Sequence, residues 1–276
     1  FRRMENIQIG NLLGGSLNPP PDVQYFWSTN AEMVWPRANQ ENAMMWGALK
    51  RAGYQPGLLD DQEYEAGAYT NAKALLLSRC TQMNPAHLDR IANDVLARGI
   101  HVHANADLPG QLDAYYRPNP DWAVRMSSIF GLNVANAVPG YESSPTNSQP
   151  EYTRVTLKGV STLGSITPAY SDFLSSWKIW HGVRAATGAA AGTTVVTHTG
   201  LNNSQPAIPA LQIKTTGQAK TAANTFALGD TFESSSRVHL WDIRYDWLRA
   251  IYRSHFGMTP AIELSSTDGG HRYVLP

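Results

Sequence analysis

The sequence feature that most constrains the fold is a strand–helix–strand unit within residues 73–104. The run 73–78, KALLLS, is short and apolar, as is typical of a strand buried on both faces of a parallel sheet. The stretch 84–99 follows with helix signals, since Asn84 can cap its first turn and Gly99 can end its last. The next residues, IHVHA, are typical of a second strand. The unit predicts two parallel strands joined by a right-handed helical crossover.

The same alternation continues on both sides of this unit. Expected strands lie at 23–27, 57–59, 151–157, 193–198, 210–215, 223–228, 261–264 and 271–275. Expected helices lie at 39–53, 84–99, 118–132 and 238–257, with a brief helix or turn at 61–69. We therefore predict an α/β fold with an open, mostly parallel sheet, helices on both faces and a β-rich insertion at about 133–221. Within that insertion, 181–194 is low in large side chains and predicts a loop excursion.

Composition excludes several classes of function. The 22 basic and 22 acidic residues balance, and without a basic stripe a nucleic-acid partner is not expected. No apolar run approaches the roughly 20 residues of a membrane helix, so no membrane partner is expected either. The single cysteine, Cys80, rules out an internal disulfide framework and does not fix the compartment.

Two stretches resemble a known family. The stretch 69–110, YTNAKALLLSRCTQMNPAHLDRIANDVLARGIHVHANADLPG, resembles the amidotransferase-like domain of large glycoside hydrolases. These are β-galactosidases in which such a domain follows the catalytic barrel and helps to trimerise it. The tail, ALGDTF followed by WDIRYDWLRAIYRSHFGMTPAIEL, is similar to that family's closing segment. The resemblance implies the class I glutamine amidotransferase-like superfamily and a three-layer, flavodoxin-like layout.

The resemblance also implies how the chain is organised and what it meets. Residues 1–21 would be a tail, the end of a preceding hydrolase domain, and 22–276 the amidotransferase-like domain. HRYVLP would begin a following β-sandwich. The implied partners are a catalytic barrel of the same polypeptide or a neighbouring subunit, in a homo-oligomer, with a glycan as candidate ligand. No cofactor is expected.

Cys80 is the first candidate for chemistry, because class I amidotransferases use a cysteine on a sharp strand-to-helix turn. Such a turn needs small neighbours, so that backbone amides can form an oxyanion hole. Here the neighbours are Arg79 and Thr81, with no glycine. In the family pattern the nucleophile follows the next strand, where this chain has Asn105-Ala106-Asp107. The expectation is that Cys80 lines a strand end and that the turn holds no nucleophile.

His101 and His103 are the second candidate. Alternation along a strand places both imidazoles on one face, about 7 Å apart, which suits a shared metal. Asp107 follows closely, and His198 ends another expected strand. The competing interpretation is that both histidines pack against a helix layer. They are weak metal candidates, and no metal is predicted.

Polar and aromatic residues at strand ends form the third set. A glycosidase needs two carboxylates, and Asp60, Asp61, Asp107, Asp230 and Glu233 can reach the carboxyl edge of the sheet, where ligands of open α/β sheets bind. Aspartates there are also ordinary helix caps, so no catalytic residue is assigned. Tryptophans are usual core or interface anchors, with Trp27 and Trp35 the best exceptions. The candidate ligand or interface residues are Trp27, Asn30, Trp35, Asn105, Asp107 and Asp230.

The favoured function is a non-catalytic accessory or oligomerisation domain of a carbohydrate-active enzyme. The alternative is a free-standing hydrolase that uses Cys80 or a His101/His103 metal site at the carboxyl edge of the sheet. A third interpretation is a sugar-binding module without an oligomeric role.

Overall fold

A computed structural model of the protein describes residues 21–28, 36–106, 108–115, 117–134, 154–170, 178–180, 186–199, 208–226, 228–229, 240–261, 263–267 and 270–274. The expected N-terminal tail therefore lies almost wholly outside the described residues, as does most of the loop expected after residue 133.

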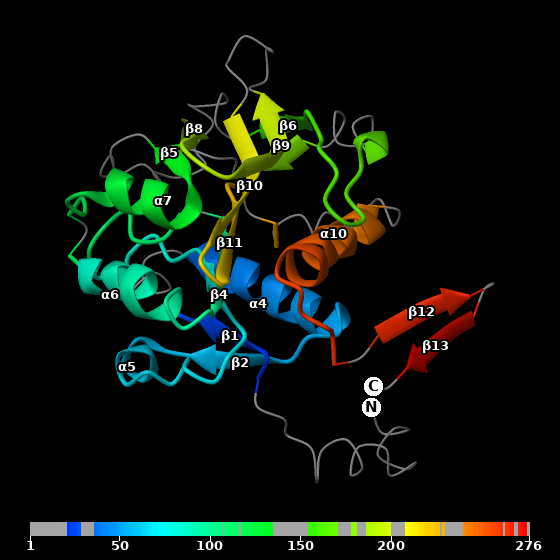
Figure 1. Ribbon diagram of the computed structural model, residues 1–276, viewed down its shortest axis with the longest axis horizontal. Coiled ribbons are helices and arrows are strands. Elements are labelled where there is room, and N and C mark those ends of the chain that lie inside the picture. The colour runs from blue at the N-terminus through cyan, green and yellow to red at the C-terminus, as the bar shows by residue number, and fades with distance from the viewer. Residues whose placement is uncertain are drawn as a thin grey trace.

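The described residues contain a nine-stranded mixed sheet in the order β2-β1-β3-β4-β11-β10-β9-β6-β7 (Figure 1). The first five strands of this order run parallel to one another: β1 (Val23–Phe26), β2 (Pro56–Leu59), β3 (Ala74–Ser78), β4 (His101–Asn105) and β11 (Ala219–Asn224). The other four pair antiparallel: β6 (Arg154–Lys158), β7 (Lys178–Trp180), β9 (Thr193–Thr199) and β10 (Ile208–Thr216). The α/β class is confirmed, and strands from the expected insertion extend the main sheet.

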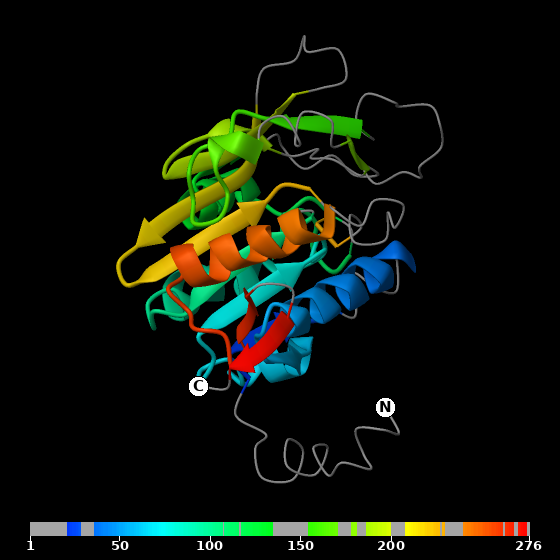
Figure 2. The same ribbon diagram turned by 90° about the vertical axis from the view of Figure 1, so that its right-hand side faces the viewer.

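Helices cover both faces of the parallel strands (Figures 1 and 2). One face carries α4 (Pro36–Arg51), α10 (Leu240–Arg249) and the π-helical turn η4 (Ala250–His255). The other carries α5 (Asp61–Glu65), α6 (Pro85–Arg90), the π-helical turn η1 (Ile91–Val95) and α7 (Trp122–Phe130). Hydrogen bonds fix the two sides: the Tyr25 hydroxyl donates to Asn42 of α4, whereas the Thr221 hydroxyl donates to the Ile129 carbonyl of α7.

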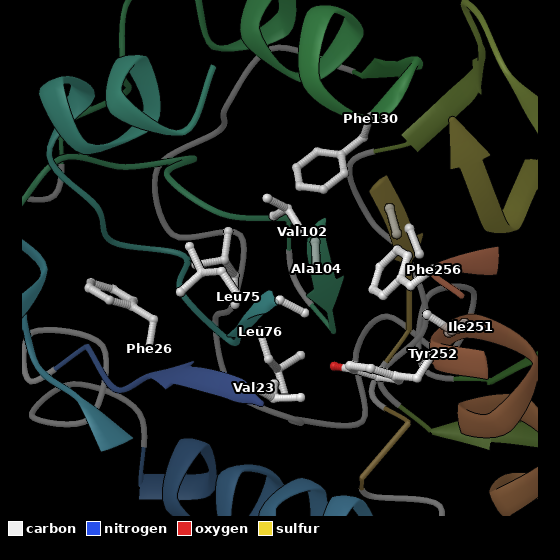
Figure 3. Packing of buried hydrophobic residues seen from close by; sticks show 14 of the residues in the cluster. Val23, Phe26, Leu75, Leu76, Val102, Ala104, Phe130, Ile251, Tyr252 and Phe256 are labelled. Carbon is white, nitrogen blue, oxygen red and sulfur yellow. The ribbon is translucent and has the colours of Figure 1, made fainter. Parts of the chain in front are cut away.

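The core fills the space between the sheet and these helices. Strand β3 is buried along its whole length, as its apolar sequence predicts. Figure 3 shows Phe130 reaching the sheet from α7, and Tyr252 and Phe256 reaching it from the side of η4, with Val102 and Ala104 of β4 between them. Burial on both faces explains why these strands lack an alternating polar pattern.

The signals of the central strand–helix–strand unit act as predicted. The Asn84 side chain accepts from the Ala86 backbone amide at 3.0 Å, with Pro85 in the first helical turn. Gly99 has φ +78°, which supplies the left-handed stop. β3 and β4 are parallel neighbours in the sheet, which confirms the predicted unit.

Two local expectations were wrong. The excursion expected at 181–194 contains β8 (Ala186–Ala189), which pairs with β5 (Leu132–Val134). The strand expected at 223–228 lies instead at 219–224, because a tight hairpin at Gly217, with φ +59°, returns the chain directly from β10 into β11.

Smaller elements complete the described chain. They are the 3-10 turn η3 (Pro168–Tyr170) and a separate hairpin of β12 (Glu263–Thr267) and β13 (Gly270–Val274). None of the helices within the described ranges combines the length and the apolar character that crossing a membrane requires.

Candidate functional site at the carboxyl edge of the parallel strands

Strands β1, β3 and β4 end at one edge of the sheet, because they run parallel. Asn105, the last residue of β4, is fully buried there. Its Nδ2 donates to the Ser78 hydroxyl at 3.0 Å, and its Oδ1 accepts from the Leu228 backbone amide at 3.2 Å. Asn105 was expected as a ligand or interface residue. In the structure its side chain links β4 to β3 and to the segment after β11 by hydrogen bonds.

The turn after β4 begins with Ala106, whose side chain is a methyl group. Ala106 lies in the left-handed region with φ +69°, is 3% exposed, and donates its amide to the Phe226 carbonyl at 3.1 Å. Such a conformation is unfavourable for a residue with a Cβ and persists only where the surroundings enforce it. The turn is therefore sharp and fixed, and Ala106 contributes no sulfur or hydroxyl to it.

A second left-handed residue follows the neighbouring strand. Arg79, directly after β3, has φ +48°, is 7% exposed, and donates its backbone amide to the Asn105 carbonyl at 3.1 Å. Two adjacent strand ends thus share the same unusual backbone state, and the hydrogen bond from the Arg79 amide links them.

Cys80 lies inside the protein. The side chain is fully buried, and its sulfur contacts the carbonyl oxygens of Ser78 at 3.4 Å and Phe26 at 3.8 Å. Burial raises the pKa of the thiol, with the nearby charge of Asp61 adding to the effect. Because the thiolate is the nucleophilic form, this environment opposes catalysis by Cys80.

His103 belongs to a buried hydrogen-bond chain that faces α10 and η4. Trp247 Nε1 donates to Asn224 Oδ1 at 2.7 Å, and Asn224 Nδ2 lies 2.9 Å from His103 Nε2. Because the indole fixes the orientation of the amide, His103 Nε2 accepts, and Nδ1 donates to the Tyr252 hydroxyl at 3.1 Å. Burial lowers the pKa of His103 to about 3, so the ring is neutral.

His101 lies on the same face of β4 as His103, as the strand alternation predicted, and its ring also makes contacts within the protein. Its Nδ1 accepts from the Lys220 backbone amide at 3.1 Å, and its ring stacks on Phe256 with centroids 4.9 Å apart. Burial, reinforced by nearby positive charge, lowers its pKa to about 4. Within the part of the chain that the structure describes, no three His, Cys, Asp or Glu side chains form a group suited to a metal.

Of the remaining candidates, Trp27 is described and half-buried at the end of β1. Its ring lies 6.0 Å from that of Tyr25, and its amide donates to the Leu59 carbonyl at 2.8 Å. Asp60 caps α5, since its side chain accepts from the Glu63 backbone amide at 2.7 Å, and Asp61 is the first residue of that helix. The candidates outside the described residues are Asn30, Trp35, Asp107, Asp230 and Glu233.

Three further residues at this end of the sheet had no signal in the sequence. His87 is 6% exposed, with Nε2 2.9 Å from Glu65 and Nδ1 3.9 Å from Asp61. Gln82 and Asn119 are buried amides in loops where polar residues are ordinarily exposed. Burial in such loops depends on contacts between distant segments, so composition alone could not have revealed it.

No protein-family model and no curated protein sequence matches the chain. Solved structures do match. A GH42 β-galactosidase from Bacillus circulans sp. alkalophilus matches with a TM-score of 0.57 and 11% identity, over 94% of this chain and 34% of its own. A catalytic mutant of Gan42B, a GH42 β-galactosidase from G. stearothermophilus, matches with a TM-score of 0.59 and 11% identity, over 95% and 34%. The exo-β-1,4-mannosidase Op5Man5 from Opitutaceae bacterium strain TAV5 gives 0.55 and 12%, over 90% and 38%.

The chain spans about a third of the length of the solved structures it matches. At identities this low, the likeness concerns the fold alone. The chain therefore has the fold of one part of a large glycoside hydrolase.

Proposed function

We propose that the chain is a non-catalytic accessory domain of a carbohydrate-active enzyme. It packs against a catalytic barrel of the same polypeptide or of a neighbouring subunit, within a homo-oligomer. The observation that carries this proposal is the extent of the likeness: 90–95% of this chain matches about a third of each glycoside hydrolase named above.

The layout we infer is flavodoxin-like and related to the class I glutamine amidotransferases. In its support, the parallel strands follow the order β2-β1-β3-β4-β11, which is the 2-1-3-4-5 order of flavodoxin-type sheets. Helices on both faces fit a three-layer arrangement. The left-handed turn at Ala106 fits a nucleophile turn whose reactive side chain has been replaced by a methyl group.

The environments of Cys80 and His103 oppose the hydrolase alternative. The thiol is buried with a raised pKa, and both ring nitrogens of His103 are hydrogen-bonded within the protein. Neither group can act on a substrate without disruption of the core.

Exposed apolar side chains supply candidate contacts with a partner. Leu58 on the edge strand β2 is 55% exposed, Tyr115 in the loop after β4 is 77% exposed, and Val124 on α7 is 67% exposed. Of the three, Tyr115 belongs to the aromatic type that protein interfaces are enriched in relative to the rest of the surface.

The catalytic half of the proposal is tested with chromogenic β-D-galactosides and β-D-mannosides. We expect no hydrolysis by the chain alone, and no difference between it and a Cys80→Ala variant. Hydrolysis above the blank that disappears in Cys80→Ala would establish the hydrolase instead.

The assembly half is tested by sedimentation equilibrium of the chain and of charge-introducing variants. We expect self-association that weakens in Leu58→Asp or Val124→Asp. The matched control is Asn93→Asp, which adds the same charge at an exposed polar residue of η1. A monomer at every concentration would contradict the homo-oligomer.

A further inference from the structure

Gln82 is a buried amide whose hydrogen-bonding capacity is unused. It lies between β3 and α6 and is 1% exposed, and neither Nε2 nor Oε1 has a hydrogen-bond partner among the described residues. Nearby, Asn119 is 5% exposed and donates Nδ2 to the carbonyls of Met83 and Gly110. Its Oδ1 likewise finds no partner in the described part of the chain.

Main-chain hydrogen bonds hold the backbone around Gln82, so a loose loop does not explain why these side-chain atoms lack hydrogen-bond partners. The Gln82 carbonyl accepts from the Ser28 hydroxyl at 3.3 Å, and Gln82 pairs with Leu112 in an isolated parallel bridge. The Leu112 amide donates to the Thr81 carbonyl at 3.0 Å, and the Met83 amide donates to the Leu112 carbonyl at 2.9 Å. Main-chain hydrogen bonds thus join the loop at residues 81–83 to Leu112, whereas the side-chain amide of Gln82 takes no part in this pairing.

Two other buried amides among the described residues, Gln212 and Asn105, use both of their side-chain polar atoms. Gln212, with no exposed surface, accepts from the Thr194 hydroxyl and donates to the Ala191 carbonyl, both at 2.6 Å. Asn105 also uses both of its side-chain atoms. Native proteins pair nearly all of their buried polar groups with hydrogen-bond partners. The unpaired side-chain atoms of Gln82 and Asn119 therefore call for a specific explanation.

The position of Gln82 is that of a ligand site. From β1 the sheet order extends to β2 on one side and to β3 on the other. Ligands of open α/β sheets bind at such a switch point, outside the carboxyl ends of the strands. Ser28 follows β1 and Gln82 follows β3, and the hydrogen bond between them spans this point.

The donors and acceptors that lack partners indicate the chemistry of the ligand. Gln82 Nε2 offers donors, whereas Gln82 Oε1 and Asn119 Oδ1 offer acceptors. A carboxylate or phosphate cannot donate to the two oxygens, and an ammonium cannot accept from Nε2. Hydroxyl groups do both, so a neutral ligand with neighbouring hydroxyls satisfies all three atoms.

We propose that Gln82 and Asn119 form a subsite for a neutral sugar at the carboxyl edge of β1 and β3. The choice of a sugar over other neutral polar ligands rests on the proposed function. Because the amides are covered in this structure, binding requires neighbouring side chains to move aside.

The test is titration of the chain with D-galactose, D-mannose and D-glucose, followed by NMR of the side-chain amide resonances. Gln82→Leu assigns the Gln82 signals by their loss. We expect a saturable shift of the Gln82 and Asn119 amide signals with at least one sugar, and a Kd about tenfold weaker, or more, in Gln82→Leu. The same variant should raise the Tm of the sugar-free chain, because it removes two unpaired buried atoms.

The controls separate binding from structure. Gln24→Leu removes another buried unpaired oxygen, on β1, and should leave sugar affinity unchanged. Gln212→Leu removes a fully bonded amide and should lower the Tm. Unshifted amide signals with every sugar, unchanged affinity in Gln82→Leu, or binding of L-asparagine in place of sugars would overturn the subsite. These outcomes are independent of the hydrolysis and sedimentation results that decide the proposed function.

Discussion

Replacement of Asn224 by leucine is expected to lower the free energy of unfolding by about 2–6 kcal/mol. Asn224 joins Trp247 to His103, and all three side chains have no exposed surface. Leucine has the same branching and number of side-chain heavy atoms as asparagine, but it cannot accept from the indole N–H or donate to the imidazole nitrogen. Each polar group left unsatisfied in the interior costs about 1–3 kcal/mol, which gives the stated range for two groups.

This loss is a large share of the total stability. Domains commonly unfold with about 5–15 kcal/mol, so the upper end of the range would leave the variant only marginally folded. The assay is urea denaturation followed by tryptophan fluorescence and by circular dichroism. Asn93→Leu, at an exposed asparagine of η1, is the matched control and should change stability by about 0.5 kcal/mol or less.

A second background makes the reasoning refutable. Trp247→Phe removes the indole N–H, so Asn224→Leu on that background should cost about 1–3 kcal/mol less than in the native chain. A cost below about 1 kcal/mol for the single Asn224→Leu variant, with an unchanged m-value, would show that the buried chain of hydrogen bonds does not stabilise the fold as argued.

Three further results are expected. The free energy of unfolding should be highest above about pH 6.5 and fall toward about pH 4. His101, His103 and His255 have pKa values in the folded protein below the unfolded value near 6.5. Below about pH 6.5 the unfolded chain therefore binds more protons than the folded one, which favours unfolding. The fall should be about 1.4 kcal/mol per pH unit from His103 alone, measured by urea titration, and a flat profile would contradict it. Cys80 should resist a thiol reagent in the native chain and react once urea unfolds it; native labelling would show an accessible thiol. Gly131→Ala should lower the Tm and cost at least about 1–2 kcal/mol, because φ is +70° and the new Cβ would lie 2.2 Å from a backbone oxygen; an unchanged Tm would contradict this geometry.

The parts of the fold that could be predicted are those specified by local signals. Asn84 and Gly99 delimit a helix through contacts with residues a few positions away, and the apolar run of β3 reports burial on both faces directly. His103 shows the limit of such reasoning. Its face was predictable from strand alternation, and packing was favoured over a metal site, but its partner Tyr252 lies 149 residues away and could not be named from the sequence.

The candidate site shows the same division. The absence of a cysteine or serine from Asn105-Ala106 was legible in the sequence, whereas the left-handed backbone of Ala106 was not, because alanine seldom adopts it. Gln82 could not be singled out at all. A polar residue between a strand and a helix is normally solvated, whereas Gln82 is buried and contacts two segments distant in sequence, at Ser28 and Leu112.

The two left-handed residues connect the fold to the proposed loss of catalysis. The conformation of Arg79 is held by a hydrogen bond to the Asn105 carbonyl, and that of Ala106 by one to the Phe226 carbonyl, so both bonds use main-chain atoms alone. The packing of the strand ends therefore imposes the left-handed backbone, and a residue with a Cβ in either turn carries strain of about 1–2 kcal/mol. A sheet edge built in this way can lose its reactive group and keep its shape. That is the physical reason why such an edge can serve as a scaffold, and why a binding role for Gln82 does not require a nucleophile beside it.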